Sequence, residues 1–183
     1  MNAIWTHTLA ASAVALAAAG LAWLAPNDAL VMGRLPAVTA KRLDHQPVPL
    51  PSGLPSERTL VLVAFSRHHQ ADLASWMAGL GLRQGGELPW VRLPVIADPG
   101  HEQGRAAVED RLKSRYPSAD ERARVLPVFT DPAAFVRTVG LGGTERASVL
   151  VVNRQGEVLA RASGAFDPEK AAALRATVLG LDD

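Results

Sequence analysis

Residues 147–162, ASVLVVNRQGEVLARA, carry the clearest structural signal in the chain. Residues 149–152 are all Val or Leu, which is typical of a strand buried on both faces. Residues 153–156 (Asn-Arg-Gln-Gly) have the composition of a tight turn, and residues 157–162 follow as a second strand. This segment therefore predicts an antiparallel β-hairpin.

The segments before the hairpin alternate between strand and helix patterns. Residues 59–65 form a continuous apolar run, and residues 70–82 follow with Leu73, Trp76 and Leu80 on one helical stripe. Pro94 has no N–H to donate, so it predicts an edge, a bulge or the end of its strand. We expect the remaining strands over residues 90–97 and 125–129, and the remaining helices over residues 103–116, 120–124 and 131–139.

Two aspartate–proline pairs mark helix starts. Asp131 and Asp167 each precede a proline, which puts an N-cap residue before proline at the first helical position. Gly140 then stops the earlier of the two helices. The resulting order is strand, helix, strand, helix, strand, helix, strand, strand, helix. It predicts an α/β fold with a mixed sheet, parallel crossovers plus a C-terminal antiparallel hairpin, flanked by helices on both faces.

The first 27 residues differ in composition from the rest. Residues 1–27 contain no Asp, Glu, Lys or Arg, and residues 4–25 are dominated by Ala, Leu, Val and Trp. A helix over residues 4–25 would rise about 33 Å, at roughly 1.5 Å per residue, which is enough to cross a bilayer. Because no positive charge precedes this segment, we expect an N-terminal hydrophobic helix that is a signal-anchor or transmembrane helix. A cleaved signal peptide is the alternative.

The side of the membrane on which the domain lies is predicted from the usual arrangement of N-terminal signal-anchors, because the charges near the apolar segment point the other way. Arg34, Lys41 and Arg42 follow the apolar segment, and the positive-inside rule would place them in the cytoplasm. A short N-terminal signal-anchor more commonly exports the domain behind it. We therefore expect a membrane-anchored domain on the exported, periplasmic side, with secretion after cleavage as the alternative.

Residues 28–57 are rich in proline and predict a linker that leads to a folded domain over residues 58–183. Proline fixes its φ angle and removes a donor, so this stretch is expected to be extended or turning, along the domain surface. Val48 and Leu50 lie between prolines and fit a short edge strand, where proline is tolerated.

Composition excludes several functional classes. The 183 residues carry 19 Lys+Arg against 18 Asp+Glu, so the net charge of +1 gives no basic footprint for nucleic acid. The chain has no cysteine. It therefore has no disulfide, no zinc–thiolate or iron–sulfur site and no cysteine nucleophile of its own.

Four features resemble the thioredoxin-like superfamily over residues 59–180. They are the buried strand that runs into a polar turn and a helix bearing Trp76, the strand and helix over residues 126–140, the hairpin, and the Arg161-Ala162-Ser163-Gly164 lead into the last helix. The second feature resembles the unit inserted in peroxiredoxins and membrane-anchored thioredoxin-like proteins. The Pro-rich lead-in, residues 59–65, Trp76 and the hairpin are also similar to mitochondrial F-type ATP synthase assembly factors, which are membrane-associated and work without redox cysteines.

The chain departs from this superfamily at the redox site. The resemblance places the redox cysteines just after Phe65, where this chain has Ser66-Arg67-His68-His69. The cis-proline of the superfamily precedes the hairpin, where this chain has Glu145-Arg146-Ala147-Ser148. Without a thiolate, thiol–disulfide exchange and thiol peroxidase activity are excluded unless another protein supplies the thiols. The resemblance implies a polypeptide-binding surface made of Ser66, Arg67, His68, His69, Arg146, Ala147 and Ser148.

A metal-binding or hydrolytic enzyme is the alternative hypothesis. His68 and His69 follow the first strand of the domain, while Asp98 and His101, with Glu102 beside them, follow the next. Imidazole with carboxylate suits zinc, copper or iron, although the usual metal spacings are absent. Ser66 with a histidine and Asp98 suggests a catalytic triad, but no Gly-x-Ser-x-Gly elbow surrounds Ser66.

The sequence favours a binding function over catalysis. We expect a redox-inactive, membrane-anchored protein with no cofactor that assists the assembly or maintenance of a membrane or envelope protein complex. The resemblance suggests the ATP synthase membrane sector as one such partner. A structural spacer in the periplasm is a third hypothesis. Arg67, Arg83 and Arg92 either form a basic patch near the binding surface or are solvated surface residues.

Overall fold

The computed structural model describes residues 32–82 and 86–181. The strands are β1 (Val38–Lys41), β2 (Pro47–Leu50), β3 (Arg58–Ala64), β4 (Trp90–Ile96), β5 (Val128–Phe129), β6 (Ser148–Asn153) and β7 (Val158–Ser163). The helices are the 3-10 turn η2 (Arg67–His69), α2 (Gln70–Gly79), α3 (Glu102–Lys113), α4 (Ala119–Arg122), α5 (Pro132–Val139) and α6 (Pro168–Leu179).

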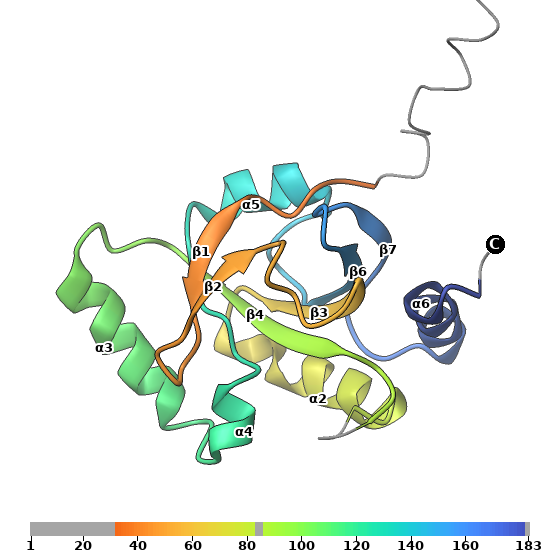
Figure 1. The fold of residues 1–183 in the computed structure, drawn as a ribbon, viewed down its shortest axis with the longest axis horizontal. Coiled ribbons are helices and arrows are strands. Elements are labelled where there is room, and N and C mark those ends of the chain that lie inside the picture. The colour runs from red at the N-terminus through yellow and green to blue at the C-terminus, as the bar shows by residue number, and fades with distance from the viewer. Residues whose placement is uncertain (1–31, 83–85, 182–183) are drawn as a thin grey trace, which may run out of the picture. The chain divides into compact units, whose positions relative to one another are not determined.

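Five strands form the central sheet, in the order β5-β4-β3-β6-β7 (Figure 1). β3 pairs in parallel with β4, and β4 with β5, whereas β6 runs antiparallel to both β3 and β7. The predicted mixed sheet with parallel crossovers and a C-terminal antiparallel hairpin is therefore confirmed. β3 is the central strand, and every residue from Thr59 to Ala64 is buried, as its continuous apolar run predicts.

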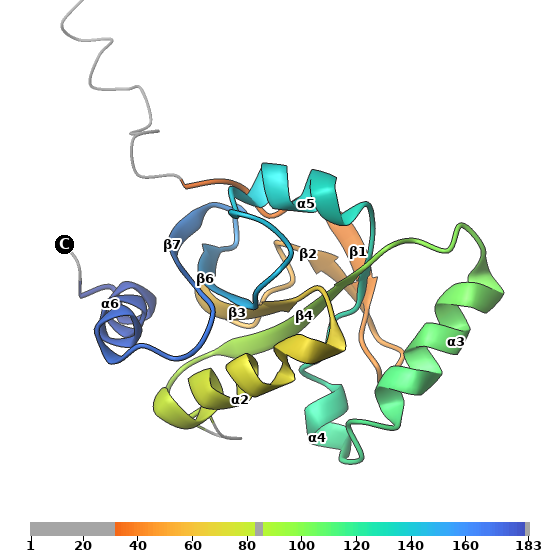
Figure 2. The same cartoon turned by 180° about the vertical axis from the view of Figure 1, so that it is seen from behind.

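Helices and a hairpin cover the two faces of this sheet. α2 and α6 lie on one face, and α5 lies on the other (Figures 1 and 2). Alternate residues of β3 separate the two cores, because Leu60 and Leu62 pack with α2 and α6, whereas Val61 and Val63 pack with α5 and the β1–β2 hairpin. Trp76 of α2 is fully buried in the first core.

The structure differs from the predicted division between linker and domain at residues 57 and 58. Residues 38–50 form the antiparallel β1–β2 hairpin, a two-stranded sheet of its own. Leu35, Ala40, Leu50 and Leu54 are buried in the core on the α5 side. Prolines are tolerated in β2 because this strand pairs with β1 on one side only, so its other edge needs no N–H donors. Val48 and Leu50, which alternate with the prolines, are more buried than the prolines are. Part of the predicted linker is thus part of the fold.

Residues 32–35 line the outer edge of β7. Met32 N–H donates to Val158 O at 3.1 Å, and Val158 N–H donates to Gly33 O at 2.9 Å. Arg34 N–H then donates to the carbonyl of Thr138 at the end of α5, at 2.8 Å. These bonds cover an edge that would otherwise expose unpaired backbone groups.

The expectation for Pro94 is corrected in part, because β4 lies inside the sheet. Its pairing with the next strand is interrupted, with a single bridge at Arg92↔Val125 and a short ladder at Val95↔Val128. Pro94 and Pro127 lie between these two pairings, and neither has an N–H to donate. The proline therefore marks a gap in one ladder and not an edge strand.

Helix caps follow the sequence. Asp131 accepts hydrogen bonds from Ala133 N–H and Ala134 N–H at the start of α5, and Asp167 caps α6 in the same way. Gly140 ends α5 with a left-handed φ of 73°. The predicted helix starts and stop are confirmed.

The predicted hydrophobic helix within residues 1–27 lies outside the described residues. Within residues 32–82 and 86–181, no helix is both long enough and apolar enough to cross a membrane.

Candidate functional site

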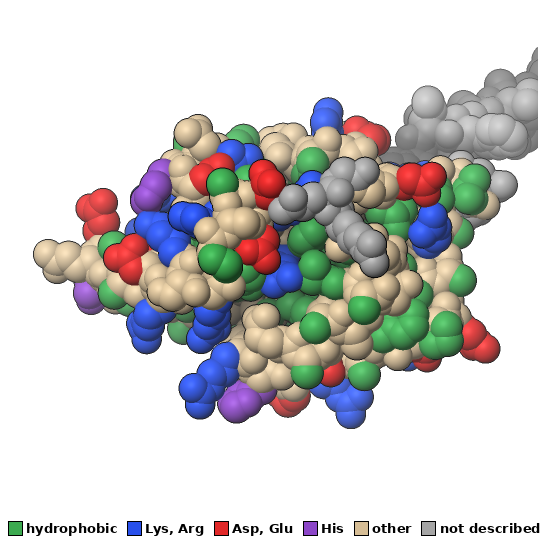
Figure 3. Space-filling model, turned by 90° about the horizontal axis from the view of Figure 1, so that it is seen from below, with side chains coloured by type: hydrophobic (Ala, Val, Ile, Leu, Met, Phe, Trp, Pro, Cys, Tyr) green, Lys and Arg blue, Asp and Glu red, His purple; other side chains and the backbone are tan. Residues whose placement is uncertain are grey.

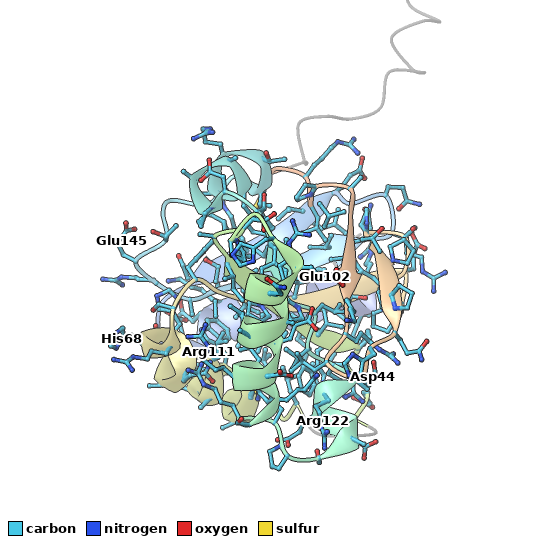
Figure 4. All side chains as sticks on the ribbon, turned by 90° about the vertical axis from the view of Figure 1, so that its left-hand side faces the viewer. Asp44, His68, Glu102, Arg111, Arg122 and Glu145 are labelled. Atoms are coloured by element: carbon cyan, nitrogen blue, oxygen red, sulfur yellow. The ribbon has the colours of Figure 1, made fainter. Side chains whose placement is uncertain are left out.

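The sheet brings the two halves of the predicted binding surface to one edge. β3 and β6 pair antiparallel with Val63 opposite Ser148, so the end of β3 and the start of β6 lie side by side. Ser66 and Arg67 continue from one strand, and Arg146 leads into the other. Figure 4 shows the labelled His68 and Glu145 on the same side of the molecule. We call the exposed residues Ser66, Arg67, His68 and Arg146 the rim.

The turn after β3 is held by its own side chains. Ser66 Oγ accepts a hydrogen bond from His68 N–H at 3.2 Å, and His69 N–H donates to Ser66 O at 3.3 Å. Ser66 therefore starts the η2 turn, which passes directly into α2. The turn leaves Arg67 and His68 exposed to solvent.

His69 faces inward. Its side chain is 5% exposed, and Nδ1 accepts a hydrogen bond from Phe65 N–H at 3.2 Å. Its ring also meets the Phe65 ring edge-on, with 6.4 Å between centroids. Because Nδ1 is an acceptor here, the neutral ring carries its proton on Nε2. His69 thus fastens the turn to the end of β3 and is not an exposed binding residue.

The start of β6 is also largely buried. Ala147 and Ser148 are buried, and Ala147 O accepts a hydrogen bond from Gly164 N–H at 2.9 Å. Of the three predicted binding residues on this side, only Arg146 is exposed. A small hollow of about 250 Å³ lies beside it, lined by Gly142, Gly143, Glu145, Arg146, Ser148 and Ser163. Of the seven predicted binding residues, the rim therefore offers four to a partner.

A larger hollow adjoins the other side of the rim. It has a volume of about 370 Å³ and lies between α2 and α3, over the carboxyl ends of β3 and β4. This position is typical of ligand sites in open α/β sheets. Ser66 and Arg67 line it, together with Arg92, Arg111 and Arg115. We call it the arginine groove.

Three of the four candidate metal ligands, Asp98, His101 and His69, are engaged separately, while His68 is exposed. Asp98 accepts two hydrogen bonds from Arg105, at 2.9 and 2.7 Å, and these bonds hold the pKa of Asp98 below its usual 3.8. His101 Nδ1 accepts from Gly104 N–H at 3.0 Å and caps α3, while His69 is bound to Phe65 as described. Among the described residues, no group of three or more His, Asp or Glu side chains lies close enough to hold a metal ion.

Sequence reasoning missed two residues of the groove. Arg111 lies in α3 and Arg115 in the turn that follows it, and the mixed charges of residues 103–116 indicate a solvated surface. The signal that could have found them is their i, i+4 spacing in the helix predicted over residues 103–116, which would put both on one face beside the apolar Leu112. Arg67 and Arg92, for which the sequence left a basic patch and a solvated surface as alternatives, line the same groove. Arg83 lies outside the described residues.

Known structures share the fold at low sequence identity. BsSco, a member of the Sco family of cytochrome c oxidase assembly proteins, is 13% identical, with 80% of this chain and 94% of that chain covered and a TM-score of 0.53. A candidate electron transfer protein from Aquifex aeolicus is 11% identical, with 82% and 95% covered and a TM-score of 0.56. An exposed lipoprotein thioredoxin from Streptococcus pneumoniae is 15% identical, with 76% and 98% covered and a TM-score of 0.50. No family model and no curated protein matches the sequence.

The sheet order and these matches define a thioredoxin-like fold. The resemblance drawn from the sequence is confirmed at this level. This chain carries the fold without a single cysteine. At the position that the resemblance assigns to the redox pair, it presents the Ser66-Arg67-His68-His69 turn.

Proposed function

We propose that this protein is a membrane-anchored, redox-inactive binding protein that assists the assembly or maintenance of a membrane or envelope protein complex. One observation carries the proposal. The hydrogen bond between His69 and the backbone of Phe65 gives the turn after β3 a fixed shape. The side chains of Arg67 and His68 in this turn are exposed and can contact a partner. A surface that is fixed in this way can bind with little loss of conformational entropy.

The absence of thiols supports binding over redox chemistry. Thiol–disulfide exchange requires a thiolate, and these 183 residues supply none. The rim combines two guanidinium groups, an imidazole and a hydroxyl, which can donate hydrogen bonds to the backbone or carboxylates of a partner. An insulin-reduction assay tests this part, and we expect no acceleration over the uncatalysed rate.

An assembly role is supported by analogy with one structure of the same fold. BsSco belongs to a family of cytochrome c oxidase assembly proteins. The apolar residues 4–25 support a location at a membrane. The similarity in sequence pattern to F-type ATP synthase assembly factors makes the ATP synthase membrane sector our first proposed client, with the domain on the exported side.

Capture from native membranes tests the proposed function. The tagged full-length protein is crosslinked, solubilised gently and purified, and the proteins that accompany it are identified by mass spectrometry. Enrichment of one membrane complex is the expected result. An empty capture would contradict a binding role and would favour metal analysis of the purified protein. Extraction of the membranes with alkaline carbonate tests the anchor, since an anchored protein stays in the pellet.

A further inference from the structure

The arginine groove carries an excess of positive charge at one place. Four arginines line it, namely Arg67, Arg92, Arg111 and Arg115, and there is no Asp or Glu among the described residues of its lining. Figure 3 shows basic side chains gathered toward the lower left of the face it draws, with a histidine beside them. Figure 4 shows the labelled Arg111 on α3 and the labelled His68 in the turn before α2.

None of these four arginines forms an ion pair with a carboxylate of the described residues. Arg34, Arg42, Arg105 and Arg175 form such pairs, whereas most other described arginines do not, so the groove is distinguished by the four unpaired arginines that line it together. The chain as a whole is almost neutral, so this cluster is a local feature and does not reflect a basic protein. Unpaired guanidinium groups in one hollow favour an anionic ligand.

The guanidinium of Arg92 is held by neighbouring side chains that carry no charge. Arg92 is half-buried on β4, with its guanidinium 5.0 Å from the centre of the Tyr116 ring and 5.9 Å from that of Trp90. Its Nη2 also lies 2.7 Å from Met77 Sδ. Aromatic rings and a thioether hold this charge in place but do not neutralise it. A carboxylate that entered the groove would do so.

Apart from Ser66 and Gln70, the rest of the lining is apolar. Its side chains include Leu62, Ala64, Leu73, Val95, Leu112 and Tyr116. A bare anion would leave this surface exposed to water, whereas a ligand with both apolar and acidic groups would cover it and pair the arginines. Because Ser66 and Arg67 line the groove and also belong to the rim, the two surfaces are continuous.

We infer that the arginine groove holds an acidic, apolar segment of the polypeptide that the rim binds, with its carboxylates on Arg92, Arg111 and Arg115. This inference rests on the proposed function and names the chemistry of the partner. A polypeptide is favoured over a lipid headgroup because the groove is recessed between two helices and continues into the rim.

A peptide-binding measurement tests the inference. The probe is a fluorescein-labelled peptide of alternating Glu and Leu, and its anisotropy is followed on adding full-length protein in neutral phosphatidylcholine nanodiscs. The same peptide with Gln in place of Glu serves as the uncharged control. We expect the double variant Arg111→Glu/Arg115→Glu to weaken binding about tenfold or more, because each charge reversal also repels the ligand. The matched control, Arg137→Glu/Arg154→Glu, changes two exposed arginines outside the groove lining and is expected to bind within about twofold of wild type.

The outcomes separate the possible ligands. Equal binding of the Glu and Gln peptides, or equal binding by the groove variant and wild type, would overturn the inference. Displacement of the peptide by short-chain phosphatidylglycerol, but not by a zwitterionic analogue, would indicate a lipid site, and displacement by inorganic phosphate alone would indicate a simple anion site. Thermal unfolding of both double variants verifies that each is folded.

The inference and the proposed function can fail independently. If the full-length protein captures a membrane complex and the Arg111→Glu/Arg115→Glu variant captures it equally well, the binding function stands and the groove inference is wrong. If the peptide binds in the groove but no complex is captured, the acidic ligand stands and the assembly role is wrong.

Discussion

The imidazole of His69 accepts a hydrogen bond from the backbone N–H of Phe65, with Nδ1 3.2 Å from the amide nitrogen. The two rings meet edge-on, and Phe65 in turn meets Phe135 of α5 edge-on, with 6.1 Å between centroids. This chain of contacts joins the turn after β3 to the helix on the far face of the sheet. The histidine at the position where the fold allows a redox centre is therefore a structural residue.

Removing the His69 ring is expected to destabilise the fold. His69→Ala leaves the partly buried Phe65 N–H without its acceptor, which costs about 1–3 kcal/mol in the free energy of unfolding. His68→Ala is the matched control, and because His68 is exposed we expect a change within about 0.5 kcal/mol. Urea denaturation measures both. Equal stability of the two variants would contradict a structural role for His69.

Gly140 is expected to tolerate no side chain. Its φ of 73° is left-handed, and a Cβ on it would meet the carbonyl oxygen of Met32, which docks there against the end of α5. Gly140→Ala should lower stability by about 1–3 kcal/mol through backbone strain and overpacking. Gly142→Ala is the control, since its Cβ would meet nothing within 4 Å. A neutral Gly140→Ala variant would argue against docking of residues 32–35 on α5.

The two buried tryptophans are expected to differ in what their N–H groups contribute. Trp76 Nε1 donates to Gly164 O at 2.8 Å, whereas Trp90 Nε1 is buried without a partner among the described residues. Trp76→Phe should therefore cost about 1–3 kcal/mol more than Trp90→Phe, because it leaves a buried carbonyl without its donor. The comparison uses chemical denaturation of both variants. A larger loss for Trp90→Phe would contradict the assignment of these bonds.

Asp98 is expected to contribute stability that depends on pH. The hydrogen bonds from Arg105 hold its folded-state pKa below the usual 3.8, and the Gly100 N–H bond adds to this effect. Because the folded-state pKa is the lower one, the contribution is present above pH 3.8 and is lost as the pH falls through the folded-state pKa. The difference in the free energy of unfolding between wild type and Asp98→Asn should thus shrink as the pH is lowered from about 6 to below 3.8, the usual pKa of an aspartate. A constant difference would contradict this.

Local patterns predicted most of the sheet and its helices. The apolar run of residues 59–65 and the turn at residues 153–156 are local signals, and they correspond to the central strand and the hairpin. The caps Asp131 and Asp167 were equally predictable, because the bonds they form join neighbours in sequence. The parallel pairing of β3 with β4 and of β4 with β5 follows from the preference for crossovers between consecutive units, whereas the antiparallel pairing of β6 with β3 does not.

The features that the sequence did not predict depend on contacts between residues that are far apart in the chain. Proline-rich composition indicates a linker, but Leu35 and Leu54 are buried by a sheet that is far away in sequence. The inward turn of His69 depends on the N–H of Phe65 being free at the end of β3. The arginine groove joins Arg67 and Arg92 to Arg111 through the packing of α3, and no spacing within one segment encodes that contact.

The central claim is that the rim binds a partner through its exposed side chains and not through thiol chemistry. The most direct measurement compares capture from native membranes by wild type, by Arg67→Ala/His68→Ala and by the control Arg137→Ala/Arg154→Ala, with the captured complex quantified by mass spectrometry. We predict that the rim variant loses most of the captured complex, while the control retains it and both variants unfold at the wild-type temperature. Undiminished capture by the rim variant would contradict the account.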